Sequence, residues 1–328
     1  MRSVTAGPVY SPADLGFWPR FGVTLRPYLL PVSAVAGLSG LALTPGVPPS
    51  AYTPALAAFL LSYGFGQALT DVFQTDTDAR SSPYRPLVRG EIGRGAVFGV
   101  ALAGLLLCGA TLAFLSPWNL ALAGAAVLGL LAYSPLKRRF WAGPPCNSMV
   151  VALLPAMGFL CGEPSLLRAA SDRMLLLLMA SVFFSYAVFV LLGYLKDVEA
   201  DRATGYDTLP VHFGRRTTVI VSAVCAAVAT VFSTILVLRG VETMSWWLLL
   251  MSAPWIAGIG LLARALVLAF RSERDEDAYP AVELSVVAFV ALHAGEAWLI
   301  RPGLGWAAIF VLALSWWLLR SRPCREQV

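Results

Sequence analysis

Long apolar runs alternate with short polar stretches along almost all of this 328-residue chain. A helix that crosses a hydrocarbon core of about 30 Å needs roughly 17 to 25 mostly apolar residues. Because the backbone finds no water to bond in lipid, each run must satisfy its own hydrogen bonds, which favours helices. We expect spans at 23–44, 52–72, 95–116, 118–133, 147–162, 173–196, 216–238, 244–270, 279–300 and 303–320.

The pattern predicts an all-α fold, a polytopic membrane bundle of nine or ten transmembrane helices. The count depends on the short run 118–133 and on the last two runs, which only Arg301-Pro302-Gly303 separates. We expect a single membrane-embedded domain over residues 1–328. Residues 1–20 contain three prolines and lack the pattern of a secretory signal peptide. They are therefore expected to be a cytoplasmic tail, and residues 321–328 a C-terminal tail.

Composition supports a membrane setting. Hydrophobic residues make up 58% of the chain and charged residues 13%, a balance that cannot cover a surface facing water. The five cysteines are scattered without metal-ligand spacing, so neither a disulfide framework nor a zinc site is indicated. The net charge of +5 comes from loops between helices, which we interpret as contact with anionic membrane lipids and not with nucleic acid.

Basic residues gather in alternate loops, those after the second, fourth, sixth and eighth runs. Short loops rich in Arg and Lys stay on the cytoplasmic side, so we expect these loops and the N-terminus to lie there. The basic C-terminal residues join them only if ten helices cross. The preference for Arg over Lys and the absence of a transit-peptide pattern suggest a bacterium with a GC-rich genome. We therefore expect the protein in a bacterial cell membrane, with its active site facing the cytoplasm.

The second apolar run ends in an acidic segment at the expected membrane boundary. Asp71, Asp76 and Asp78 lie within eight residues. On a continuous helix, Asp71 and Asp78 would share one stripe with Gln74, and Asp76 would point elsewhere unless the helix unwinds.

The sixth run ends in a similar way, with Asp197 and Asp201 four residues apart. On one helix face these carboxylates would repel each other unless a cation lay between them. Mg²⁺ is commonly bound by one or two carboxylates together with phosphate oxygens. The two acidic segments could therefore clamp a diphosphate through Mg²⁺. The alternative is that each cluster only solvates a helix end.

Basic side chains near these segments are candidates for phosphate contact. Only two of the 24 basic residues are lysines, Lys137 and Lys196, and an ammonium group is a compact donor that suits phosphate oxygens. Arg85 and Arg89 follow the first acidic segment and could bind a diphosphate, or could simply anchor the loop.

Aromatic residues precede both segments: Tyr63 and Phe65 before the first, and Phe184, Tyr186 and Phe189 before the second. Their faces could stabilise a carbocation, although ordinary packing would also explain them. In the ninth run, His293 and Glu296 lie three residues apart. They could pair with each other, and we assign them no catalytic role.

Taken together, these residues resemble the UbiA superfamily of intramembrane prenyltransferases. In its first motif, Asn-Asp-x-x-Asp-x-x-x-Asp, the first and last acidic places are matched by Asp71 and Asp78, and the continuation by Arg85-Pro86-Leu87 and Gly90. The remaining matches are Asp197, Asp201, Gly205 and Thr208-Leu209-Pro210 for the second motif, Tyr133-Ser134-Pro135 with Lys137 for the stretch between, and Arg26-Pro27 for the start of the first helix. The resemblance covers residues 20 to about 300.

The first motif departs from the family pattern at two places. Thr70 stands where the family usually has Asn, and Gln74 stands where it has the middle Asp. An amide oxygen can bind a metal ion but brings no charge. Either Asp76 compensates through a distorted backbone, or this protein holds its first Mg²⁺ differently.

The resemblance implies a helical bundle around a lipid-open cavity that ionises an allylic isoprenoid diphosphate. It implies metal binding by Asp71, Gln74, Asp78, Asp197 and Asp201, with Asp76 as a further candidate; the four carboxylates other than Asp76 would be catalytic. It also implies diphosphate binding by Arg85, Lys137, Lys196, Tyr133 and Arg89. The prenyl group would pass to an aromatic or other lipophilic acceptor.

Two other functions stay open at this point. A terpene cyclase of the same superfamily would turn the cation on its own chain, and the altered Gln74 motivates that alternative. A transporter or lipid-binding protein without catalysis would also contain many helices, but its site would lie near the bilayer midplane and not at helix ends.

Overall fold

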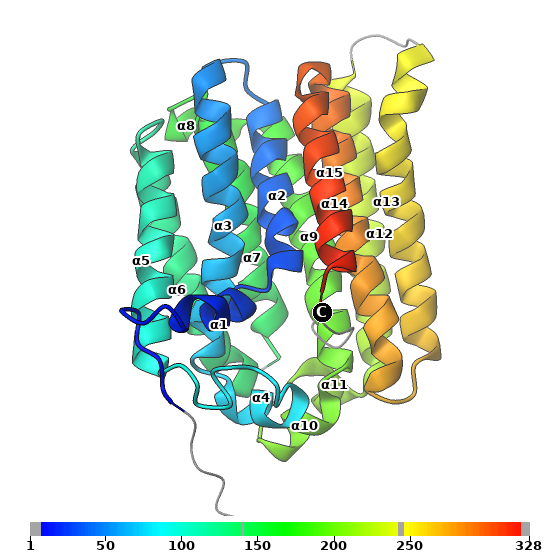
Figure 1. Ribbon diagram of the computed structural model, residues 1–328. Coiled ribbons are helices and arrows are strands. Elements are labelled where there is room, and N and C mark those ends of the chain that lie inside the picture. The colour runs from blue at the N-terminus through cyan, green and yellow to red at the C-terminus, as the bar shows by residue number, and fades with distance from the viewer. Residues whose placement is uncertain (1–7, 140, 242–245, 323–328) are drawn as a thin grey trace, which may run out of the picture.

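The computed structural model describes residues 8–139, 141–241 and 246–322. These ranges form a bundle of long helices with most of the short helices gathered at one end (Figure 1). The long helices are α2 (Leu30–Ala42), α3 (Tyr52–Asp71), α5 (Arg94–Ala113), α6 (Trp118–Arg139), α7 (Gly143–Leu160), α9 (Arg173–Leu195), α12 (Arg215–Gly240), α13 (Trp246–Arg271), α14 (Tyr279–Ile300) and α15 (Gly305–Arg320).

Shorter helices connect them. These are α1 (Phe17–Thr24), α4 (Thr75–Ser81), α8 (Leu166–Ser171), α10 (Val198–Ala203) and α11 (Leu209–Phe213), with single 3₁₀ turns at Pro27–Leu29, Pro49–Ala51, Glu276–Ala278 and Pro302–Leu304. In the described ranges, the only β-type pairing is one bridge between Tyr10 and Ile92.

The all-helical membrane fold is confirmed. Within the described residues, eight helices are long and apolar enough to span a membrane, and up to ten if each of two bent helix pairs is one span. The run expected at 118–133 is longer than the sequence indicated, because α6 continues through Pro135 to Arg139. Its last turns are polar but partly buried in the bundle, so apolar character ends there before the helix does.

Part of the expected tail of residues 1–20 has regular structure. Helix α1 begins at Phe17, and the Tyr10 backbone N–H donates to Glu91 O at 2.8 Å. Between α1 and α2 the backbone turns at Arg26, which has a left-handed φ of 48°. Of the expected tails, residues 1–7 and 323–328 lie outside the described part of the chain.

Helix α14 forms the centre of the bundle. It contacts α2, α9, α12, α13 and α15 and is buried on nearly every side, as expected for a helix that is apolar all round. The close approach of α2 to α7 depends on glycine. A Cβ atom on Gly40 would overlap the backbone of Pro155, and one on Gly158 would overlap that of Gly37. Small residues allow membrane helices to pack this closely.

A buried polar cluster ties α14 to α9. As the sequence suggested, His293 Nδ1 pairs with Glu296 Oε2, at 2.6 Å. The Ser181 hydroxyl donates to Glu296 Oε1 at 3.0 Å, and Ser185 lies 2.9 Å from His293 Nε2. His293 and Glu296 are fully buried, and buried polar groups must find partners of this kind. The cluster therefore fixes how α14 sits against α9.

The short helices α4 and α10 lie together across one end of the bundle (Figure 1). The chain bends by 98° between α3 and α4, so the expected continuous helix through Asp71, Gln74 and Asp78 is wrong. Polar side chains compete with helical hydrogen bonds here, and acidic residues in the first turns of α4 and α10 favour new helix starts. Thr77 and Thr204 join the two helices through their hydroxyl oxygens, 2.9 Å apart.

Candidate active site

A cavity of about 100 Å³ lies where α3, α6, α7 and α9 approach the short helices α4 and α10. The bend after α3 and the break between α9 and α10 place residues of both acidic segments beside it. Its polar lining comes from Arg26, Gln67, Thr70, Asp71, Gln74, Thr77, Asp78, Ser81, Arg85, Lys137, Asn147, Lys196 and Asp197, and its aromatic lining from Tyr63, Tyr133, Tyr186, Phe189 and Tyr194.

Arginines hold the first acidic segment together. Asp71 at the end of α3 receives a hydrogen bond from Arg26 at 2.6 Å. Arg85 Nη1 lies 2.5 Å from Asp78 Oδ2 and 3.6 Å from Asp71 Oδ2. The bend therefore brings Asp71 and Asp78 to one guanidinium group. The sequence predicted that these two side chains lie close together, but on one face of a continuous helix.

Lysines accompany the second acidic segment. Lys137 Nζ lies 3.1 Å from Asp201 Oδ1, and both side chains are almost entirely buried. Lys196 Nζ lies 3.2 Å from Asp197 Oδ2. Asp197 lines the cavity, whereas Asp201 does not. Asp201 lies behind the cavity wall, where it pairs with the lining residue Lys137.

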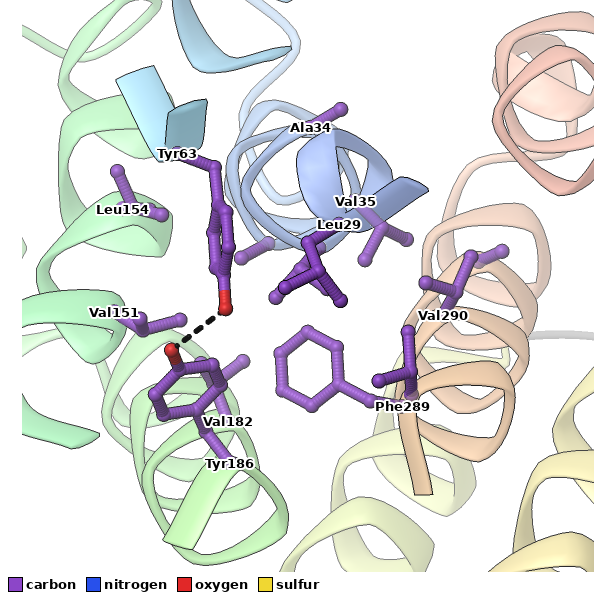
Figure 2. Close-up of a cluster of buried hydrophobic side chains, with 14 of the residues drawn as sticks. Leu29, Ala34, Val35, Tyr63, Val151, Leu154, Val182, Tyr186, Phe289 and Val290 are labelled. Atoms are coloured by element: carbon purple, nitrogen blue, oxygen red, sulfur yellow. Dashed lines mark hydrogen bonds between the residues drawn. The ribbon is translucent and has the colours of Figure 1, made fainter. Parts of the chain in front are cut away.

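Tyrosine pairs form much of the inner wall. Tyr194 donates its hydroxyl to Tyr133 at 3.0 Å, and the Lys137 ammonium lies 5.1 Å from the centre of the Tyr194 ring. Deeper in the bundle, the hydroxyls of Tyr63 and Tyr186 are 3.0 Å apart. Figure 2 shows this second pair pointing toward each other from α3 and α9, among aliphatic side chains and Phe289.

Besides Asp201, two further sequence candidates lie outside the cavity. Asp76 faces away from it, where it pairs with Arg138 at 2.8 Å and is 43% exposed. Arg89 is 58% exposed beside Glu91. Of the aromatic candidates, Tyr63, Tyr186 and Phe189 line the cavity, whereas Phe65 packs near Phe21 and Phe184 stacks on Phe232.

Sequence reasoning did not select Gln67, Asn147 or Arg26 as site residues, although all three line the cavity. Gln67 and Asn147 are polar residues within otherwise apolar spans, and that was the available signal, since such groups are costly in lipid unless they face the interior. For Arg26 the sequence signal is the Arg26-Pro27 pair, which resembles the start of the first helix in the family.

The model of the UbiA prenyltransferase family matches residues 30–292, most of the chain. The chain belongs to the UbiA prenyltransferase family. It is therefore a membrane enzyme of that family, which confirms the expectation of an enzyme over that of a transporter. The matched range contains both acidic segments and every residue of the cavity except Arg26 and Leu29.

Curated UbiA relatives include two archaeal digeranylgeranylglyceryl phosphate synthases. The protein from Natronomonas pharaonis is 31% identical over 214 residues, which cover 64% of this chain and 74% of that one. The protein from Methanoregula boonei is 29% identical over 261 residues, which cover 79% of this chain and 84% of that one.

Solved structures of UbiA homologues share the fold. The apo structure of a homologue from Aeropyrum pernix K1 has a TM-score of 0.68 at 19% identity, covering 82% of this chain and 96% of that one. A homologue from Archaeoglobus fulgidus bound to GPP and Mg²⁺ has a TM-score of 0.60 at 16% identity, covering 92% and 99%. At such identities the likeness concerns the arrangement of helices.

The charged side chains in and directly behind the wall of this UbiA-family cavity balance each other. Four carboxylates (Asp71, Asp78, Asp197 and Asp201) accompany four cations (Arg26, Arg85, Lys137 and Lys196). A diphosphate brings several negative charges into this neutral set, so its binding requires additional positive charge. Divalent cations would supply that charge.

The two carboxyls of the second segment differ in their surroundings. Burial favours the neutral form of Asp197, but the charges of Lys196, Lys137 and Arg85 outweigh burial and hold the pKa of this carboxyl below its ordinary value. Burial raises the pKa of Asp201 above its ordinary value, in spite of the opposing charge of Lys137. The Asp197 carboxyl is therefore the more readily ionised of the two, and the Asp201 side chain is the more deeply buried.

The residues of the cavity fit divalent metal binding with phosphate as a co-ligand. In the described part of the chain, no three His, Cys, Asp or Glu side chains come close enough to hold a metal ion on their own. Mg²⁺, however, usually takes only one or two carboxylates and completes its shell with phosphate oxygens and water. Asp71 Oδ2 is buried without a hydrogen-bond partner there. Gln74 donates its amide nitrogen to Ser134 at 3.3 Å, which leaves its amide oxygen as the end that could bind a metal ion.

Proposed function

We propose that this protein is a Mg²⁺-dependent intramembrane prenyltransferase that ionises an allylic isoprenoid diphosphate in the cavity described above. One observation supports the proposal most strongly. The acidic segments after α3 and α9, far apart in sequence, line a single cavity together with Arg26, Arg85, Lys137 and Lys196. From the distribution of basic loops, we further propose that this end of the bundle faces the cytoplasm.

The basic side chains would bind the diphosphate. Arg85 presents a planar fork that can contact two phosphate oxygens at once, and it already lies between Asp71 and Asp78. Lys137 and Lys196 reach the cavity from α6 and from the end of α9. Tyr133 lies beside Lys137 in the lining and has a hydroxyl that can donate to an oxygen.

Asp71, Gln74, Asp78 and Asp197 would hold Mg²⁺ together with the phosphate oxygens. When bound, the metal ion stabilises negative charge on the departing diphosphate. We propose that Asp201 contacts neither the metal ion nor the diphosphate and instead holds Lys137 in position. We also propose that Asp76 and Arg89 contact neither group.

The reaction itself would begin with cleavage of the bond between the allylic carbon and the diphosphate oxygen, with the electron pair leaving on the diphosphate. The rings of Tyr133, Tyr194 and Phe189 line the same cavity and would stabilise the allylic cation through their faces. Helices α4 and α10 lie across the end of the bundle and would limit water entry. The acceptor then attacks the allylic carbon and loses a proton.

The names of the curated relatives suggest an acceptor. Digeranylgeranylglyceryl phosphate contains two geranylgeranyl groups on glyceryl phosphate, so a hydroxyl of a glycerol phosphate lipid is the acceptor class we propose first. An aromatic acceptor is the second candidate. The terpene cyclase is the alternative function that Gln74 motivates, because a neutral amide reduces the negative charge of the first acidic segment.

Diphosphate turnover by the purified protein tests the function. We expect pyrophosphate release from C10 to C20 allylic diphosphates, its loss on chelation of divalent ions, and recovery on addition of Mg²⁺. A prenylated lipid formed only with a glycerol phosphate or phenolic acceptor supports a transferase. A cyclic hydrocarbon or alcohol formed without any acceptor supports the cyclase. Absence of pyrophosphate release across the panel, with and without acceptors, rejects both.

A further inference from the structure

The loop between α13 and α14 binds the first turn of α10. This loop covers residues 272–278 and lies at the same end of the bundle as α10 (Figure 1). In it, Asp275 Oδ1 accepts a hydrogen bond from Arg215 Nη1 at 2.8 Å, and Asp275 Oδ2 accepts the backbone N–H of Glu199 at 2.9 Å. A carboxylate 76 positions away in sequence therefore holds the start of α10.

The start of α10 is capped in an unusual way. The N–H groups in the first turn of a helix have no partner within the helix. An aspartate at the N-cap position usually accepts one of these N–H groups with its own side chain. Asp197 is the N-cap residue of α10, yet within the described ranges its side chain makes no such bond. Glu199 is the second residue of α10, so Asp275 caps the helix in place of Asp197.

The Asp197 carboxylate has other neighbours. It lines the active-site cavity and lies 3.2 Å from Lys196 Nζ. A carboxylate that bonded the N–H groups of its own helix would be held against that backbone, with less of its charge free for a cation. Because Asp275 already accepts the Glu199 N–H, the Asp197 carboxylate stays available on the cavity side.

Arg215 fixes Asp275 relative to the end of α9. It is the first residue of α12, and its Nη1 also donates to the backbone oxygen of Leu195, the last residue of α9, at 2.8 Å. Its Nη2 donates to Arg274 O at 2.8 Å. A cation at a helix C-terminus satisfies the last carbonyl groups and interacts well with the helix dipole. Both sides of the break between α9 and α10 are thus held by one ion pair.

We propose that Asp275 is a positioning residue, which caps α10 so that the Asp197 carboxylate faces the cavity and can bind a divalent cation. The proposal rests on the proposed function, in which Asp197 helps to hold Mg²⁺. Without Asp275, part of the protein would adopt a state in which Asp197 caps its own helix. The apparent affinity for the metal ion then falls with the fraction that stays competent, and excess metal ion restores that fraction.

Mn²⁺ binding to the purified protein tests this role. Binding is followed by loss of the sharp EPR signal of Mn²⁺ in solution, with one equivalent of a non-ionising C15 thiolo diphosphate present. Asp275→Ala should weaken Mn²⁺ binding by about tenfold or more, a common cost of losing a residue that orients a metal ligand. The Mg²⁺ concentration for half-maximal pyrophosphate release should rise by a similar factor, while the rate at saturating Mg²⁺ stays within about twofold of wild type.

Glu276→Gln is the matched control, because it removes the same charge from the next residue, which is exposed. It should change Mn²⁺ affinity by no more than about twofold. Since Asp275 acts through Asp197, adding Asp275→Ala to Asp197→Asn should cause no further loss of affinity. Additive losses in that double variant, or equal affinities in Asp275→Ala and Glu276→Gln, would overturn the proposal.

Two further measurements complete the test. Asp275→Asn keeps an acceptor oxygen and should lose less affinity than Asp275→Ala. Where the alanine variant does not fold, an Asp275→Asn affinity equal to that of Glu276→Gln overturns the proposal. In a crystal structure of Asp275→Ala, the Asp197 carboxylate should accept the N–H of Glu199 or Ala200, and an unchanged Asp197 side chain would contradict the capping role. If this turn is seen but wild type binds no Mn²⁺ with the analogue, the proposed function fails and the capping role stands.

Discussion

Replacing Asp197 or Asp71 by asparagine is expected to lower pyrophosphate release from an allylic diphosphate by roughly a thousandfold, a typical cost of losing one preorganised electrostatic contact in an active site. Each substitution keeps the size of the side chain and removes one negative charge. Both carboxylates line the cavity, one from each acidic segment. The loss should appear in the rate of release at saturating substrate and Mg²⁺, measured with a coupled pyrophosphate assay.

Asp76 provides the matched control for this experiment. It belongs to the same acidic segment as Asp71, but it is 43% exposed and bound to Arg138 outside the cavity. Asp76→Asn should therefore change the rate by no more than about twofold, as for ordinary surface substitutions. A wild-type rate in both Asp71→Asn and Asp197→Asn would place the chemistry elsewhere. A large loss in Asp76→Asn would mean that Asp76 replaces the missing carboxylate at Gln74.

Replacing Lys137 by methionine is expected to impair both diphosphate binding and folding. The substitution removes a cation from the cavity wall and leaves the fully buried Asp201 without the ammonium that lies 3.1 Å away. Breaking a buried ion pair in this way typically costs about 3–5 kcal/mol. We expect a lower thermal midpoint for the detergent-solubilised protein, together with loss of pyrophosphate release. Arg138→Met, which breaks an exposed pair, should cost less than about 1 kcal/mol.

A double variant separates the two effects of Lys137. Lys137→Met combined with Asp201→Asn removes both charges and should recover part of the lost stability, because no unpaired carboxylate stays buried. It should not recover diphosphate binding, which needs the ammonium itself. Recovered turnover in the double variant would make Lys137 a structural residue only. A raised Mg²⁺ requirement in Asp201→Asn with Lys137 intact would make Asp201 a metal ligand in its own right.

The fold follows from the sequence where apolar character and helical structure coincide. The spans of α5, α9, α12 and α15 were predicted within a few residues because lipid or apolar neighbours surround them along their length. Helix α6 shows why a hydropathy pattern fails at a site. Tyr133 and Lys137 continue the helix as buried polar residues, and an apolar run cannot reveal polar side chains that are satisfied by partners on other helices.

The sequence predicts which residues belong to the candidate site better than it predicts how they are arranged. Motif spacing selected Asp71, Asp78 and Asp197, yet neither Gly nor Pro lies between Asp71 and Thr75 to indicate the bend of 98°. The partners of these carboxylates come from distant segments. Arg26 reaches Asp71 through a left-handed turn before α2. Such long-range ion pairs depend on how helices pack, which local spacing does not encode.

The most direct test of the central claim is anomalous diffraction from crystals grown with Mn²⁺ and a non-ionising thiolo diphosphate analogue. We predict manganese peaks beside Asp71 and Asp78 and beside Asp197, bridged by the phosphate groups, with Arg85 and Lys137 in contact with phosphate oxygens. A diphosphate bound outside this cavity, or manganese bound without contact to either acidic segment, would contradict the account.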